Sequence, residues 1–261
     1  MAMKQDSPPG SGPGTVYNTQ AMFSYDATLA AAVQAPAQSI AGVLRTMQVI
    51  DGACIDGDGL KWFNWLYRQV TQAVEARVAS GGFADAAWLA ELDVQFARLY
   101  FGALASLLSG RRAPGCWQAL FERRGQTAVA RIQFALAGIN AHINHDLPEA
   151  IAATCEATGT VPQSGSTQYL DYTALNSTLE SLLDSARQTL HVRLLGDALP
   201  VVSHVEDTIA AWSVSAAREK AWHNAELLWH LRASPQFSAS FLDCLDGLAT
   251  VAGKALLVPA P

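Results

Sequence analysis

The sequence has few cysteines and no paired ones. Its 261 residues include four cysteines, Cys54, Cys116, Cys155 and Cys244, and none of them forms a Cys-x-x-Cys pair. A zinc ribbon requires such pairs and a small secreted fold requires a disulfide framework, so the scattered cysteines argue against both classes. This cysteine usage is typical of a reducing compartment, and we expect a cytoplasmic protein.

The chain also lacks basic clusters, long apolar runs and a secretion signal. It has 17 lysines and arginines against 23 acids, a formal net charge of −6, and no basic cluster longer than a pair. We expect no nucleic-acid partner, because phosphate binding needs a concentrated basic surface. No apolar run reaches the roughly 18 residues of a membrane helix, so we expect no membrane partner. The first fifteen residues lack the apolar core of a signal peptide.

Strand patterns and phosphate-binding loops are missing too. No segment alternates apolar and polar residues over a strand length, and neither GxGxxG nor GxxxxGKS occurs. Residues 1–25 have little apolar content and are predicted to be a disordered tail. Half of the chain is hydrophobic, so residues 26–261 can bury one large core. Apolar residues at steps of three and four predict an all-α single domain of about seven to nine helices, packed as an irregular bundle.

The periodicity also places the long helices and their ends. Asp58 and Asp171 are predicted to cap the helices that follow them. The polar stretch Gly159–Leu170 is either a lid or a long connection. The longest predicted helices cover residues 58–79, 85–109, 172–194, 205–232 and 236–253.

The segment Asn140–Pro148 puts polar side chains at the end of an apolar helix. His142 and Asp146 are four residues apart and lie on the same side if the helix continues. Pro148 disfavours helical geometry at the preceding residue, so the helix is predicted to break or kink there. Asp146 then either caps a second helix over 147–158 or faces a site together with His142.

Small residues come just before this segment. Ala135 and Gly138 lie on the same side of the helix as His142. Nearly without side chains, they either let another helix approach closely or leave room for a ligand.

Two further charged residues lie on apolar helix faces. Asp93 is either paired with a basic side chain or functional, because an isolated buried carboxylate is costly. Arg218 shares a face with Trp222 and Trp229. It either stacks its stem on Trp222 or points into the central pocket, opposite Asp93 or Asp146. The candidate substrate-binding residues are Asn64, Tyr67, Tyr100, Asn140, Asn144 and Trp222.

These residues carry a resemblance to a known family. The sequence Asn-Ala-His-Ile-Asn-His-Asp-Leu-Pro at 140–148 resembles the hallmark of a helical bacterial family that is catalogued only as a domain of unknown function. The resemblance extends over about residues 40–230 and implies a helical fold and a site, without an activity. It also rests on Phe63, Asn64, Tyr67, Thr71, Asp93, Tyr100, Arg218, Ala221 and Trp222.

The His-x-x-x-Asp spacing of His142 and Asp146 carries a weaker resemblance. It is similar to the metal-binding pairs of the all-helical zinc phospholipase C and S1/P1 nuclease group. The chain lacks the further histidines of that group, so the resemblance does not imply a trinuclear site. A site for one or two metals stays open.

Two functions remain open. As an enzyme, the protein would use His142 as general base, Asp146 as orienting acid and Arg218 to stabilise negative charge. His142, Asp146 and Asp93 could also hold one divalent metal, zinc, iron or manganese. The reaction would be hydrolysis, cyclisation or isomerisation of a small apolar metabolite. Alternatively, the protein is a non-catalytic module that binds a small apolar ligand or a protein partner, and the polar cluster is structural. The sequence does not indicate the oligomeric state.

Overall fold

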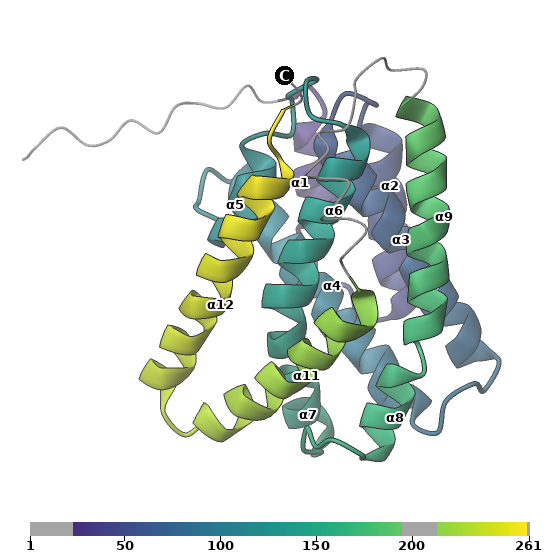
Figure 1. Cartoon of the computed structure of the whole chain (residues 1–261), viewed down its shortest axis with the longest axis vertical. Helices are drawn as coiled ribbons and strands as arrows, with labels where there is room; N and C mark the ends of the chain where they lie inside the picture. The colour runs from purple at the N-terminus through teal and green to yellow at the C-terminus, as the bar shows by residue number, and fades with distance from the viewer. Residues whose placement is uncertain (1–22, 195–212, 260–261) are drawn as a thin grey trace, which may run out of the picture.

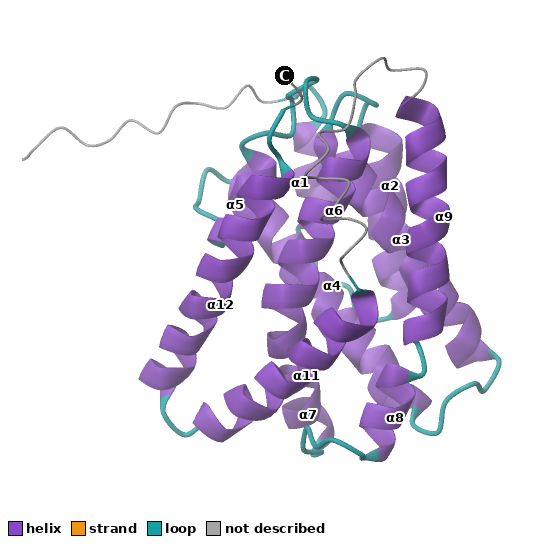
Figure 2. Ribbon diagram, viewed as in Figure 1, coloured by secondary structure: helices purple, strands orange, loops and turns teal. Residues whose placement is uncertain are grey.

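The computed structural model describes residues 23–194 and 213–259, and every regular element in these ranges is a helix (Figure 2). This confirms the predicted all-α fold class. Two short helices, α5 (Gly115–Phe121) and α8 (Thr167–Thr173), and a π-helical turn, η1 (His142–Asp146), accompany the longer ones. The nine described helices of eight residues or more are α1 (Asp26–Val33), α2 (Ile40–Ala53), α3 (Gly59–Ala79), α4 (Ala86–Leu108), α6 (Arg131–Ala141), α7 (Leu147–Thr158), α9 (Asn176–Leu194), α11 (Val214–Leu231) and α12 (Pro235–Leu256).

The succession α6, η1 and α7 runs through the middle of the bundle (Figure 1). α3 and α12 pack against α6, while α4 and α11 pack against α7. The turn η1 therefore contacts α4, α11 and α12 at once. In the described ranges, no helix is long and apolar enough to cross a membrane.

Capping carboxylates fix where α3 and α4 begin. The Asp58 carboxylate accepts a hydrogen bond from the Leu60 amide at 2.9 Å, as the sequence predicts. Asp85 accepts one from the Trp88 amide at 3.0 Å. Each bond satisfies an amide that has no partner in the first turn of a helix. The two helices thereby present their buried faces, which carry Tyr67 and Asp93, toward the core.

Small residues allow α3 and α6 to approach closely. A Cβ atom at Gly138 would overlap the ring of Phe63, and one at Gly59 would overlap the ring of Phe134. Gly138 therefore allows another helix, α3, to approach α6 closely, which is the first of the two roles predicted for the small residues. Phe63 fills the space that a ligand would need.

Asp171 does not cap the helix that follows it, so this prediction is wrong. Asp171 lies inside α8, and α9 begins only at Asn176. Its carboxylate instead accepts hydrogen bonds from the amides of Ala84 and Asp85, at 3.0 and 2.6 Å, just before α4. A side chain that caps a distant helix is invisible to local capping rules.

One predicted helix is only partly described, whereas the predicted lid or connection is described in full. The helix predicted over 205–232 is described from Val214 onward, and its first residues lie outside the described ranges. The connection 159–166 precedes α8, and Ser164 donates two hydrogen bonds to Glu226 of α11, both at 2.6 Å. These contacts attach the connection to the fold.

The described fold begins before the predicted tail boundary at residue 25. Residues 1–22 lie outside the described ranges, but the Tyr25 hydroxyl donates to Asp58 at 2.9 Å. The guanidinium of Arg124 lies over the ring of Phe23 and also pairs with Asp26 and Asp58. This buried ion cluster connects the first described residues to the start of α3.

Candidate functional site

Of the break or kink predicted at Pro148, the structure shows no break, and the helix is instead distorted into the π turn η1 just before this proline. α6 continues through η1 into α7, and the Leu147 amide donates to the His142 carbonyl five residues back. Pro148, in the first turn of α7, has no amide hydrogen to donate and crowds the preceding turn of an α-helix. The wider π turn relieves that crowding. Such turns often mark functional sites.

Asp146 accepts three hydrogen bonds in the centre of the bundle. Its Oδ2 lies 2.9 Å from Nδ1 of His142 and 3.0 Å from Nε1 of Trp117, and its Oδ1 lies 2.8 Å from Nδ1 of His145. The residue is 1% exposed. Its backbone is helical and its side chain caps no amide, so the capping role predicted as one alternative is wrong.

These contacts set the protonation of the two histidines. Burial alone would raise the pKa of Asp146, but the hydrogen bonds from His142 and His145 bring it below its ordinary value. Burial lowers the pKa of His142. The hydrogen bond to Asp146 acts in the opposite direction but does not outweigh burial. Burial also lowers the pKa of His145, but the hydrogen bond to Asp146 and the charge of that carboxylate raise it above its ordinary value. An ionised carboxylate only accepts, so the hydrogen between the two residues is on Nδ1 of His142. Because burial lowers the pKa of His142, the neutral ring, with a lone pair on Nε2, is favoured at neutral pH.

The Nε2 atom of His142 is buried and has no hydrogen-bond partner among the described residues. Its ring stacks on Phe96, with the centroids 3.4 Å apart and the planes at 7°, and it meets the edge of Tyr67 at 4.4 Å. Phe63, Tyr100 and Trp117 complete an aromatic wall. His142 is 3% exposed, whereas Phe96 is only partly buried.

Asp93 is buried without a basic partner in the described part of the chain. It is 7% exposed, and its Oδ2 accepts no hydrogen bond there. Burial, and then the charge of Glu75, raise its pKa to about 8. Asp93 was predicted either to pair with a basic side chain or to be functional, and these contacts do not support the pair.

The predicted metal ligands His142, Asp146 and Asp93 do not form a group that could hold a metal ion. Among the described residues, no three His, Cys, Asp or Glu side chains lie where they could hold a metal ion. Both oxygens of Asp146 already accept hydrogen bonds from neighbouring rings. The divalent-metal prediction stays a prediction.

Among the described residues Arg218 pairs with neither Asp93 nor Asp146, so its predicted role as a cation opposite them finds no support. The packing of its stem on Trp222 stays a prediction. Nε of Arg218 donates to Asn176 Oδ1 at 2.8 Å, its Nη2 donates to the Tyr172 carbonyl at 2.9 Å, and its guanidinium lies 3.9 Å from the Tyr172 ring centre. Arg218 thus fastens α11 to α8 and α9. The helical period placed it on an apolar face but did not identify the neighbouring helix.

Trp222 lies in a separate aromatic cluster. It packs against Trp88, Tyr169 and Tyr172, and its Nε1 donates to Glu226 at 3.1 Å. The ring contacts of His142 do not include it. The structure therefore does not bring Trp222 to His142.

The predicted asparagines have structural partners. Asn64 donates to the Met47 carbonyl at 2.9 Å and accepts from the Tyr100 hydroxyl at 3.4 Å. Asn140 donates to the Ala249 carbonyl of α12 at 2.7 Å and accepts from Asn144 at 3.1 Å. These bonds join α2 to α3 and α6 to α12. Of the predicted substrate-binding residues, Tyr67 has a buried hydroxyl without a hydrogen bond.

Two members of the site carry no clear signal in the sequence. Trp117 lies in the short helix α5, 29 positions before the carboxylate that accepts its hydrogen bond. His145 is adjacent to Asp146, and on a regular α-helix it would point to a different side. The π turn brings both histidines into contact with the Asp146 carboxylate. No local sequence pattern predicts a π turn.

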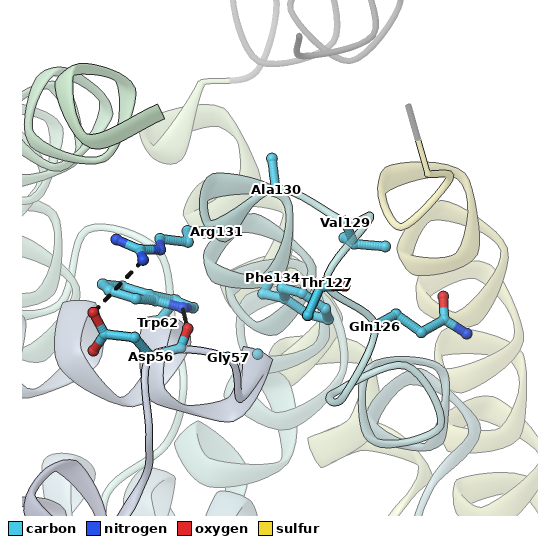
Figure 3. A pocket seen from close by; sticks show the side chains of 10 residues that line it. Asp56, Gly57, Trp62, Gln126, Thr127, Val129, Ala130, Arg131 and Phe134 are labelled. Carbon is cyan, nitrogen blue, oxygen red and sulfur yellow. Dashed lines mark hydrogen bonds and ion pairs between the residues drawn. The ribbon is translucent and has the colours of Figure 1, made fainter. Parts of the chain in front are cut away.

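A separate pocket of about 240 Å³ lies at the opposite end of α6 (Figure 3). Arg131 lies over the Trp62 ring at 4.5 Å and pairs with Asp56 at 3.6 Å. None of the predicted site residues lines this pocket, so the sequence and the pocket point to different places. Its lining residues are Asp56, Gly57, Gly59, Trp62, Gln126, Thr127, Val129, Ala130, Arg131 and Phe134.

The chain matches one family of proteins. Searches of curated proteins and of solved structures find no match, so the likeness to the zinc phospholipase C group gains no support. The model of DUF5995, a family of unknown function, matches residues 40–259. This range runs from α2 through α12 and includes the whole His142 site, beyond the predicted end near residue 230. The chain therefore belongs to the DUF5995 family, whose function is unknown.

Proposed function

We propose that the protein is an acid–base enzyme acting on a small, largely apolar molecule, with His142 as general base. The observation that carries this proposal is the buried, unpartnered Nε2 of His142. Its lone pair is fixed in place because Nδ1 of the same ring is held by Asp146 at 2.9 Å. Asp146 is the orienting residue.

An unpaired buried acceptor needs a physical reason. Leaving such a group without a partner costs about 1–3 kcal/mol, and nearly all buried polar groups in native proteins are paired. Asp146 also accepts from Trp117 and His145, so the imidazole is held by a network and not by one contact. A free lone pair on a rigidly held ring is what proton abstraction requires.

The electrostatics support the same role. Burial lowers the pKa of His142, so the ring is an unprotonated base at neutral pH. When it takes a proton, the Asp146 carboxylate stabilises the resulting imidazolium. We assign no role in this step to Arg218, because its donors are directed to Tyr172 and Asn176. Isomerisation and cyclisation, which begin with proton transfer, suit the enclosed aromatic surroundings best.

Access to His142 requires a side chain to move. The ring is 3% exposed and lies under Phe96, which is itself only partly buried. A change of Phe96 rotamer would open the path to Nε2 without disturbing the Asp146 network. Phe96 is therefore assigned as the covering residue of the site.

The same burial favours a second candidate function. A cluster that is closed on every side by aromatic rings can serve to specify one packing of the core. The protein would then be a non-catalytic module that binds a small apolar ligand or a protein partner. Turnover distinguishes the two functions.

The experiment compares three proteins in a small-molecule extract of the source cells. Wild type, His142→Gln and the control His223→Gln are incubated with the extract, and mass spectrometry follows the compounds consumed and formed. His223 is a suitable control because its side chain is 56% exposed on α11. The proposal expects at least one conversion with wild type and His223→Gln that His142→Gln has lost. Identical profiles for wild type and His142→Gln would leave only the non-catalytic function.

The same preparations test the metal prediction. Emission spectroscopy on tag-free protein measures zinc, iron and manganese per chain. Near-stoichiometric metal in wild type that is lost in both His142→Gln and Asp93→Asn would support a metal site. Metal that is unchanged by both variants would place it elsewhere.

A further inference from the structure

Three further polar atoms around His142 lack partners among the described residues. They are the Tyr67 hydroxyl, Thr71 Oγ1 and Asp93 Oδ2. Tyr67 is 4% exposed, Thr71 0% and Asp93 7%, so water does not satisfy them from the surface. Four unpaired polar groups in one region, His142 Nε2 included, are costly unless something binds them.

These groups lie where α3, α4 and η1 meet. Tyr67 and Thr71 are one turn apart on α3, and Asp93 is one turn before Phe96 on α4. The ring of Tyr67 contacts both His142, at 4.4 Å, and Phe96, at 5.7 Å. Burial raises the pKa of Tyr67 well above its ordinary value, and the charge of Asp93 raises it further. An interaction with the Thr71 hydroxyl, which does not reach hydrogen-bond geometry, lowers it. Thr71 and Asp93 therefore both influence the Tyr67 hydroxyl.

We propose that Tyr67, Thr71, Asp93 and His142 together bind an uncharged oxygen group, a carbonyl or a hydroxyl, on the apolar substrate. This inference rests on the proposed function and names its substrate class. It also gives Asp93 a role as a neutral hydrogen-bond donor.

The hydrogen-bonding capacity of the four groups matches such an oxygen. The hydroxyls of Tyr67 and Thr71 donate, and a protonated Asp93 donates as well. His142 Nε2 accepts, from a substrate hydroxyl or from an acidic C–H beside a carbonyl. Neutral donors in a dry site can stabilise negative charge that develops on a carbonyl oxygen.

Phosphate and carboxylate substrates do not fit this site. Burial and Glu75 account for the raised pKa of Asp93, with no contribution from a cation. Arg218, the buried cation of α11, has its donors on Tyr172 and Asn176. An anion placed among Asp93, Asp146 and these rings would lose its hydration without gaining a counter-charge. The surroundings therefore select against charged ligands.

The rest of the substrate would lie against aromatic rings. Phe96 stacks on His142 with the planes at 7°, and this is the geometry that a flat apolar group would adopt if it took the place of Phe96. Removal of the Phe96 ring leaves a space of that shape. Apolar cavities made in this way bind benzene-like molecules.

The test uses four probes with the same ring. Acetophenone and 1-phenylethanol are neutral, and benzoate and phenyl phosphate are anionic. Binding to wild type and to Phe96→Ala is measured by NMR titration. We expect both neutral probes to bind, more tightly in Phe96→Ala, and both anions to bind at least tenfold more weakly.

Matched threonine variants assign the binding to the four groups. Thr71→Val removes an unpartnered buried hydroxyl, whereas Thr154→Val removes one that donates to the Ala150 carbonyl at 2.7 Å in α7. Thr71→Val is expected to weaken neutral-probe binding at least tenfold and to raise Tm. Thr154→Val should leave binding unchanged and lower Tm.

Three results overturn the inference. They are anion binding as tight as neutral binding, neutral binding that is unaffected by both Thr71→Val and Tyr67→Phe, and no neutral binding in either wild type or Phe96→Ala. Each is read from binding alone, whereas the acid–base function is read from turnover in the extract. A failure of either proposal is therefore recognised separately.

Discussion

At the scale of single residues, the ionisation of Asp146 depends on three donors. A carboxylate at 1% exposure is strongly disfavoured unless hydrogen bonds replace its hydration. His142 and His145 contribute two of these bonds, and Trp117 contributes the third. Removal of any one of these donors should therefore lower the free energy of unfolding by more than the lost burial of its ring alone would.

Two buried tryptophans test this directly. Trp117→Phe removes the bond to the Asp146 carboxylate, whereas Trp88→Phe removes an Nε1 that donates to no charged group among the described residues. Both rings are fully buried, so the two losses of volume are similar. Urea unfolding should show Trp117→Phe to be less stable than Trp88→Phe by about 1.5–3 kcal/mol, the value of a bond to a charged group. Equal losses would mean that the Trp117 bond contributes nothing.

Asp93 should make stability depend on pH. Its pKa is about 8 in the folded protein against an ordinary 3.8, so between these values the folded state holds a proton that the unfolded state has released. Wild-type stability therefore falls as pH rises through this range. Asp93→Asn has no such group. Its free energy of unfolding should therefore rise relative to that of wild type by about 2–3 kcal/mol between roughly pH 6 and pH 9. Unfolding curves at the two pH values measure it, and a constant difference would refute the raised pKa.

The sequence predicted some site residues and misplaced others for a physical reason. His142 and Asp146 share a helix turn, so a spacing of four was enough to pair them. Arg218 belongs to another helix, and which neighbour it meets depends on how α11 packs on α8 and α9. Trp117 reaches Asp146 only through tertiary packing.

At the scale of elements, the π turn decides the geometry of the site. Pro148 predicted a break or a kink because a regular α-helix does not accommodate proline in its interior. The extra residue in η1 keeps α6 and α7 joined and turns His142 and His145 toward the same carboxylate. Turn type is set here by the packing of neighbouring helices on η1, which a local pattern does not contain.

The close approach of α3 and α6 gives a prediction for two helical glycines. A Cβ at Gly138 would overlap the Phe63 ring, whereas a Cβ at Gly102 in α4 meets no atom within 4 Å. Gly138→Ala should therefore destabilise the protein by about 1–3 kcal/mol through overpacking. Gly102→Ala should stabilise it by up to about 1 kcal/mol, because alanine is the better helix former. Thermal unfolding of both variants checks this, and a stabilising Gly138→Ala would contradict the tight contact.

At the scale of the whole molecule, the folded unit extends beyond the family match. That match begins at residue 40, yet α1 packs against α2 and α4. Arg124 joins Asp26 of α1 to Asp58 before α3, and all three side chains are buried. The region before residue 40 is thereby part of the same core.

The ion cluster of Arg124, Asp26 and Asp58 should contribute far more to the stability of the fold than an ion pair nearer the surface. Arg124→Met leaves two buried carboxylates without their cation, which should cost about 3–5 kcal/mol. The control, Arg68→Met, breaks a pair with Asp51 in which the side chains are 25% and 20% exposed. That change should cost at most about 1 kcal/mol. Chemical unfolding compares them, and similar losses would contradict a structural role for the cluster.

The sequence predicted the all-α fold well because apolar residues recur at helical spacing over most of the described chain. Predictions of long helices, such as 58–79 against the observed Gly59–Ala79, depend on local periodicity and capping. The arrangement of the helices depends on contacts between distant positions, such as Asp171 with Ala84 and Asn140 with Ala249. No local pattern records those pairs.

The central claim is that His142 is a neutral base with a free Nε2, and nitrogen NMR of histidine-labelled protein tests it most directly. His142→Gln assigns the signal by its loss. At neutral pH we predict a hydrogen on Nδ1 and an unprotonated Nε2, with protonation only below the ordinary pKa of 6.5. A hydrogen on Nε2, or an imidazolium at neutral pH, would contradict the account.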